Sequence, residues 1–135
     1  MPGPDPAHWL HRLTAPEWLA AAANELANAD AAVARRATRA ALAHARRAAG
    51  MAWNAVLIDH PDARAGRSYM EHVAALADDP AVPDEVRAAA QALRQTSAAP
   101  PALIPLGRPG SSPDQALVRA ARAILDHAGR VVRPS

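Results

Sequence analysis

Apolar residues recur at intervals of three and four positions along most of this chain. That spacing gathers them on one face of an α-helix, whereas a half-buried strand would need strict alternation of apolar and polar residues. No stretch alternates in that way, so we expect no β-sheet. The apolar stripes and their boundaries predict five helices. The first runs from Thr14 to a break near Arg35–Thr38, and the second runs from that break to about Ile58. The other three span Ser68 to Asp78, Pro83 to about Gln95, and Ser112 to Val132.

Three of the predicted helix starts carry a capping box, in which a Ser or Thr and a Glu or Gln three residues later cap each other's backbone N–H groups. They are the segments Thr14–Glu17, Ser68–Glu71 and Ser112–Gln115. The Asp78–Pro80 segment ends the third helix, because proline does not continue a helix. The break near Arg35–Thr38 contains neither Gly nor Pro. We place it there because a single helix reaching Ile58 would be unusually long.

The predicted fold class is all-α, an up-and-down bundle of about five helices. Residues 1–13, with three prolines, are predicted to form an irregular N-terminal arm, and residues 14–132 a single helical bundle domain. We expect Trp53 to be largely buried between the second and third helices, so that Trp53→Ala costs roughly 3–5 kcal/mol of stability. The side chains expected around Trp53 are those of Leu42, Val56, Tyr69 and Leu76.

Alanine dominates the apolar content of the chain. Half of the 135 residues are hydrophobic, and alanine alone makes up roughly a quarter of the chain. Alanine favours helices but buries little area, so the helices can approach closely around a few larger side chains. The apolar runs are too short to span a bilayer and the N-terminus lacks the pattern of a signal peptide. We therefore expect a cytoplasmic protein without a membrane partner.

The charge and cysteine content exclude some classes of site. The absence of cysteine excludes disulfides and cysteine metal sites. All 15 basic residues are arginines, and the net charge is only +2 although the isoelectric point is ≈ 10.3. A composition rich in arginine and alanine is typical of GC-rich coding, so the high isoelectric point alone does not indicate a nucleic-acid surface.

The most organised stretch is H-A-R-R-A-A-G-M-A-W-N-A-V-L, which begins at His44 in the second predicted helix. With its adjacent small residues Ala48 and Ala49, it resembles the alanine-rich helix of the HEPN (higher eukaryotes and prokaryotes nucleotide-binding) family. Val73-x-x-Leu76 is similar to the end of the family's His-Asp-Leu-x-x-Leu motif, although Glu71 occupies the place of the family's histidine. The resemblance covers roughly residues 15–95. It implies a helical bundle, a nucleotide or RNA ligand, and a homodimer.

Ribonuclease members of that family have an Arg-x(4–6)-His motif late in the bundle, where the arginine stabilises phosphate charge and the histidine acts as acid or base. The late loop of this chain contains Arg108 but no histidine at that spacing. Arg67 and His72 have the spacing, but they lie at the start of the third predicted helix. The resemblance therefore favours a non-catalytic member and leaves Arg67 and His72 as catalytic candidates under an alternative hypothesis.

The residues before the last predicted helix form the best candidate for an anion or nucleotide site. Arg108, Gly110, Ser111 and Ser112 supply a guanidinium, backbone N–H groups and hydroxyls at a helix N-terminus. Unpaired N–H groups and the helix dipole favour an anion at such a position. The alternative interpretation is a plain helix cap after a proline-rich loop. The glycine–lysine pattern of a phosphate-binding loop is absent.

Other chemistry has little support in the sequence. The six histidines do not form a metal-binding pattern and no His-Glu-x-x-His occurs, so we expect neither a metal nor another cofactor. The common serine and cysteine hydrolase motifs are absent. Asn54 lies within an apolar helix face, which predicts a hydrogen-bonded core amide rather than a site residue.

Two function hypotheses follow from the sequence. The first is a non-catalytic HEPN-like bundle that forms a homodimer and binds a nucleotide, RNA or a partner protein. The second is a small metal-independent endoribonuclease, similar to a toxin, that uses Arg67 and His72. The placement of these two side chains discriminates between the hypotheses. Convergence in a cleft supports the enzyme, whereas an exposed Arg67 and a His72 packed against helices argue against it.

Overall fold

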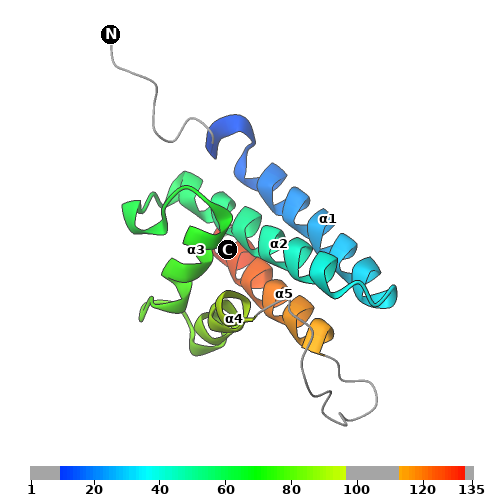
Figure 1. The fold of residues 1–135 in the computed structure, drawn as a ribbon. Coiled ribbons are helices and arrows are strands. Elements are labelled where there is room, and N and C mark those ends of the chain that lie inside the picture. The colour runs from blue at the N-terminus through cyan, green and yellow to red at the C-terminus, as the bar shows by residue number, and fades with distance from the viewer. Residues whose placement is uncertain (1–9, 97–112, 133–135) are drawn as a thin grey trace.

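The computed structural model describes residues 10–96 and 113–132, and these residues form an all-α bundle without a strand (Figure 1). The predicted fold class is confirmed. Two short 3-10 helices accompany the five α-helices in the described ranges. The elements are η1 (Leu10–Arg12), α1 (Ala15–Ala34), α2 (Thr38–Asp59), η2 (Ala63–Ala65), α3 (Tyr69–Ala77), α4 (Asp84–Gln95) and α5 (Pro113–Val132).

Two of the three predicted capping boxes are present in the structure. The Thr14 hydroxyl accepts the N–H of Glu17 at 3.3 Å, and the Glu17 carboxylate accepts the N–H of Thr14 at 2.9 Å. Ser68 and Glu71 make the same pair of bonds at the start of α3. The third box begins at Ser112, which lies outside the described residues. Because a capping box is a local arrangement of four residues, sequence alone places it well.

The predicted break between the first two helices is confirmed, since α1 ends at Ala34 and α2 begins at Thr38. Arg36 has a φ angle of 59°, in the left-handed region that non-glycine residues rarely adopt. This residue reverses the chain within a very short connection. The two helices consequently form an antiparallel hairpin (Figure 1).

α5 packs along α2 in the same direction as α2. Near the starts of the two helices, the Thr38 hydroxyl donates to Asp114 Oδ2 at 3.1 Å. Near their ends, the Trp53 and His127 rings stack with centroids 6.1 Å apart and planes inclined by 12°. A parallel pair requires a return connection, and the shorter helices α3 and α4 provide it.

α3 packs on α2, and α4 packs mainly on α3 and α5 and reaches α2 at few points. His72 of α3 contacts Asn54 in the second half of α2. Arg46, in the first half of α2, donates to the backbone carbonyls of Leu93 and Thr96 at 2.9 and 2.6 Å. These two carbonyls belong to the C-terminal end of α4, so a side chain of α2 satisfies acceptors that the helix itself leaves unpaired.

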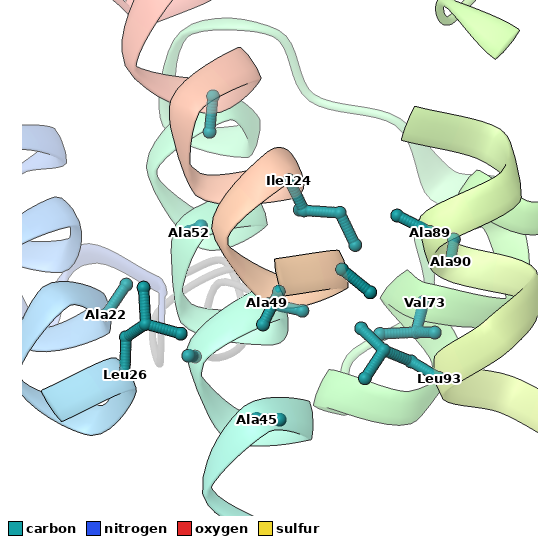
Figure 2. Packing of buried hydrophobic residues seen from close by; sticks show 14 of the residues in the cluster. Ala22, Leu26, Ala45, Ala49, Ala52, Val73, Ala89, Ala90, Leu93 and Ile124 are labelled. Atoms are coloured by element: carbon teal, nitrogen blue, oxygen red, sulfur yellow. The ribbon is translucent and has the colours of Figure 1, made fainter. Parts of the chain in front are cut away.

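The core lies around α2 and α5, with α1 on one side and the α3–α4 pair on the other (Figure 2). The inner face of α2 consists mostly of fully buried alanines, and α1 and α4 also contribute alanines. Small side chains allow close helix contact, and larger ones from neighbouring helices fill the remaining space. The largest fully buried apolar side chains are Leu76, Leu93, Ile124 and Val73.

Gly50 lies at a close contact between α2 and α3. A Cβ atom added at Gly50 would overlap the Cβ and ring atoms of Tyr69. The glycine therefore weakens the intrinsic stability of α2 but lets Tyr69 pack directly on its backbone. Tyr69 is consequently half-buried on α2 rather than part of the fully buried core.

The predicted placement of Trp53 is wrong. Its side chain is partly buried, and its ring stacks on His127 of α5, a helix that the prediction did not place beside it. The more deeply buried tryptophan is Trp18, whose indole N–H donates to the carbonyl of Leu10 at 2.7 Å. Leu10 is itself buried against Leu57, so the end of the predicted arm packs on the bundle.

None of the helices in the described ranges combines the length and the hydropathy that a membrane span requires.

Candidate functional site

His72, one of the two catalytic candidates, is completely buried at the junction of α2, η2 and α3. Its Nδ1–H donates to the carbonyl of Ala65 at 2.7 Å, and its Nε2 lies 2.8 Å from Oδ1 of Asn54. Burial lowers the pKa of His72, while the bond to Ala65 and the charge of Glu71 act in the opposite direction. The ring is therefore held neutral in the interior.

A neutral His72 determines how the Asn54 amide is turned. If Nδ1 carries the proton, Nε2 is an acceptor and needs a donor opposite it. The buried Nδ2 of Asn54 has no partner while Oδ1 faces the ring. Turning the amide by 180° lets Nδ2 donate to Nε2, and oxygen and nitrogen of an amide are interchangeable in such assignments. The prediction that Asn54 is a hydrogen-bonded core amide is thus confirmed.

The geometry of Arg67 and His72 argues against catalysis by this pair. Arg67 is exposed at the surface, whereas His72 is fully buried and faces the protein interior. A general acid or base must come within hydrogen-bond distance of the substrate. The ring of His72 has no surface through which a substrate could reach it in this conformation.

The predicted anion site falls in a segment without a described structure. Arg108, Gly110, Ser111 and Ser112 all lie outside residues 10–96 and 113–132. The helix that they precede does begin at Pro113. The site therefore remains a prediction from sequence.

A second group of polar side chains lies between α1 and α2. Glu25 Oε2 lies 2.6 Å from Nδ1 of His44, and Glu25 Oε1 lies 3.8 Å from Nη1 of Arg47. The exposed fractions of the three side chains are 14% for Glu25, 23% for His44 and 47% for Arg47. A half-buried carboxylate thus holds an imidazole and lies beside a guanidinium that reaches solvent.

Tyr69 and Arg12 extend this group. Burial raises the pKa of the Tyr69 hydroxyl, and its electrostatic neighbours are Arg12, Glu25 and Arg47. The two arginines favour the ionised phenol and Glu25 opposes it, so all three charges lie close enough to act on Tyr69. We call the five residues Arg12, Glu25, His44, Arg47 and Tyr69 the Glu25 cluster.

Several hydrogen-bonding groups of the Glu25 cluster are unengaged. Within the part of the chain that the structure describes, neither His44 Nε2 nor the Tyr69 hydroxyl has a hydrogen-bond partner. The same is true of the Arg12 and Arg47 guanidinium groups, apart from the loose contact of Arg47 with Glu25. Positive charge and open donors beside a fixed imidazole can receive an anion with several acceptor oxygens.

The sequence analysis missed this cluster, although the hairpin register contains a signal for it. When two antiparallel helices are joined by a short turn, residues at equal distances from the turn lie side by side. The connection between Ala34 and Thr38 therefore places Glu25 opposite the His44–Arg47 segment. The pairing is visible only after the position of the turn is known.

Two other surface features carry less chemistry. An open groove of ≈ 440 Å³ between α1 and α5 is lined by Leu19, Leu125, Asp126, Gly129 and Arg130. Among the described residues, no three His, Asp or Glu side chains gather closely enough to hold a metal ion.

Compared with models of known protein families, with curated proteins and with solved structures, the chain matches none of them.

Proposed function

We propose that this chain is a non-catalytic helical-bundle module of the HEPN type that binds the phosphate of a nucleotide or RNA at the Glu25 cluster. The observation that carries the proposal is the carboxylate of Glu25, which holds His44 at 2.6 Å and lies 3.8 Å from Arg47, with Tyr69 in electrostatic reach of Glu25, Arg47 and Arg12. Arginine suits this role because its planar guanidinium can bind two phosphate oxygens together.

The non-catalytic part of the proposal is supported by the burial of His72. A histidine with both ring nitrogens directed at interior partners is a structural residue, and its position excludes substrate contact in this conformation. The alternative function, metal-independent RNA cleavage through Arg67 and His72, predicts that wild type degrades RNA in the presence of a chelator and that His72→Ala does not. We expect no degradation by either protein.

Phosphate binding is tested by titrating adenosine monophosphate and a short RNA into wild type, Arg47→Gln and Arg122→Gln. We expect Arg47→Gln to weaken binding at least roughly tenfold, because charge-assisted hydrogen bonds are lost. Arg122 is the matched control. It lies on α5 and pairs with Asp30 at 3.5 Å, on a different face of α1 from Glu25. Equal affinities of all three proteins, or no binding to any of them, would contradict the proposal.

A homodimer is the second part of the proposed assembly. The resemblance implies it, and the alanine-rich helices would allow close contact between two copies. We expect light scattering to give twice the chain mass of 14.1 kDa. A mass of one chain at tens of micromolar would show that the protein works as a monomer, and it would leave phosphate binding untouched.

A further inference from the structure

Gly50, Gly66 and Gly129 lie in the described ranges, and the fold requires the first two to be glycine. Gly50 makes room for Tyr69, and Gly66 has a φ angle of 71° that other residues rarely adopt. Gly129 has neither reason. Its φ angle is not positive, and no described atom outside its own stretch of helix lies within 4 Å of a Cβ built there. Because glycine weakens a helix relative to alanine, Gly129 costs stability without improving the packing of a single copy.

Gly129 lies in the open groove of ≈ 440 Å³ between α1 and α5. The apolar part of the lining is Leu19 of α1, which is buried beneath the groove, and Leu125 of α5, which is half-buried. Ala23 follows Leu19 by one helical turn on the same edge of α1 and is exposed. A bare backbone beside these apolar side chains lets another helix approach more closely than a side chain at position 129 would allow.

Two opposite charges flank Gly129 at the rim of the groove. Asp126 and Arg130 are one helical turn apart on α5, and both are exposed and line the groove. Neither side chain makes a hydrogen bond or an ion pair with the described part of the chain. Arg122, two turns earlier on α5, does pair with Asp30 of α1. The unpaired charges are therefore confined to the groove end of the seam between α1 and α5.

We infer that this groove is the interface of the homodimer, with α5 of a second copy lying antiparallel across α5 near Gly129. The inference rests on the homodimer in the proposed function and names its interface. In an antiparallel pair of helices related by a two-fold axis, residues equally far before and after the crossing point face each other. With the crossing point between them, Asp126 meets the partner's Arg130, and Arg130 meets the partner's Asp126.

The charge pattern of α5 argues for a second copy as the occupant. One acidic and one basic residue on the same helix face are complementary to an identical face turned end to end, so two pairs form at once. A parallel arrangement would bring like charges together and align the two helix dipoles unfavourably. The two-fold contact also covers Leu19, Ala23 and Leu125 in both copies, so each apolar surface is buried twice in the dimer.

The test reverses the two charges one at a time and measures the dimer dissociation constant by analytical ultracentrifugation. Asp126→Arg and Arg130→Asp should each raise this constant at least roughly tenfold, because like charges then meet across the interface. An equimolar mixture of the two variants should recover dimers, since every charged position again faces the opposite charge. Glu85→Arg, at an exposed position of α4, makes the same change in net charge as Asp126→Arg and should leave the constant unchanged.

Substitution of the glycine gives a second readout. Gly129→Leu places a large side chain in the groove and should raise the dissociation constant at least roughly tenfold, with a smaller rise for Gly129→Ala. When both proteins are diluted to monomers, Gly129→Ala should unfold at a higher temperature than wild type, because alanine favours the helix. A variant that is more stable as a monomer and weaker as a dimer has not lost association through misfolding.

The outcomes separate the interface from the homodimer itself. A wild-type dimer that Asp126→Arg, Arg130→Asp and Gly129→Leu leave intact would overturn this interface while the homodimer stands. A mixture of the two charge variants that is no more dimeric than either variant alone would also overturn it. A wild-type mass of one chain at tens of micromolar would overturn the homodimer and the interface together, and phosphate binding at the Glu25 cluster would still be decided by its own titration.

Discussion

His72 and His44 each place a ring nitrogen on an oxygen acceptor, but the two histidines lie in opposite kinds of environment. His72 is fully buried, and its ring is directed at a backbone carbonyl on one side and a side-chain amide on the other. His44 is half-buried, with one nitrogen on Glu25 and the other without a partner in the described chain. The first arrangement is complete within the protein, whereas the second leaves one ring nitrogen unpaired among the described residues.

The comparison shows that burial distinguishes a structural histidine from a functional candidate better than sequence spacing does. The Arg-x(4)-His spacing made His72 a catalytic candidate. In the structure His72 is buried at the junction of α2, η2 and α3. His44 begins the alanine-rich stretch of α2 and belongs to no catalytic motif, but one of its ring nitrogens has no partner among the described residues. The following predictions test this contrast, beginning with the largest expected effect.

The contrast would break if the two histidines contributed equally to stability. We expect His72→Ala to lower the free energy of unfolding by roughly 3–5 kcal/mol, since it leaves a cavity and removes the partners of Asn54 and Ala65. His44→Ala, at a partly exposed position, should cost less than about 1 kcal/mol. Urea unfolding of both variants measures the difference. Similar losses in the two proteins would show that His44 is also structural.

Two glycines allow the same comparison between a tightly packed position and an open one. Gly50→Ala should lower stability by roughly 1–3 kcal/mol, because the new Cβ overlaps Tyr69 and forces α2 and α3 apart. Gly129→Ala is the matched control. A Cβ there has nothing within 4 Å, so the better helix propensity of alanine should raise stability by about 0.5–1 kcal/mol. Thermal unfolding of both variants tests the signs, and a stable Gly50→Ala protein would contradict the close contact.

The pH dependence of stability gives a smaller, graded signal from His72. Burial lowers the pKa of His72 in the folded state. Below about pH 6.5 the unfolded chain therefore binds a proton that the folded His72 ring does not bind. The contribution of His72 to the free energy of unfolding is therefore fully present above the pKa that His72 has in the unfolded chain. It decreases as the pH falls toward the lower pKa that His72 has in the folded protein. Urea unfolding between pH 7.5 and 5 should show this decrease, and His72→Gln should reduce its slope.

His127 is the control for that measurement. Burial, assisted by the charge of Arg130, also lowers the pKa of His127, so this residue contributes a slope of the same sign. His127→Gln isolates its share of the pH dependence. If removing His127 abolished the whole decrease, the buried ring of His72 would not be the source.

The parts of the fold that sequence predicted well depend on neighbouring residues along the chain. The Thr14 and Ser68 caps are four-residue arrangements, and the apolar stripes report directly which face of each helix turns inward. Arg36 had no such signal, because its positive φ is imposed by the hairpin rather than favoured by its own side chain.

The failures concern which helix lies next to which. Trp53 is correctly placed toward the other helices, but α2 has neighbours on several sides and the helical period does not say which one a residue meets. The same limit hid the pairing of Glu25 with His44, which are 19 residues apart. The neighbour of Trp53 and the pairing of Glu25 with His44 both depend on how two helices are aligned. Packing between the helices determines this alignment, and the hydrophobic period of one helix does not reveal it.

The short turn between α1 and α2 also has a consequence for the order of folding. The two helices adjoin in sequence, so closing their hairpin costs little loop entropy and can occur early. α5 has to join a partner far away along the chain, as the 76-residue separation of Thr38 and Asp114 shows. We therefore expect α5 to dock late and to be the first long helix to open, with its amides exchanging hydrogen for deuterium faster than those of α2.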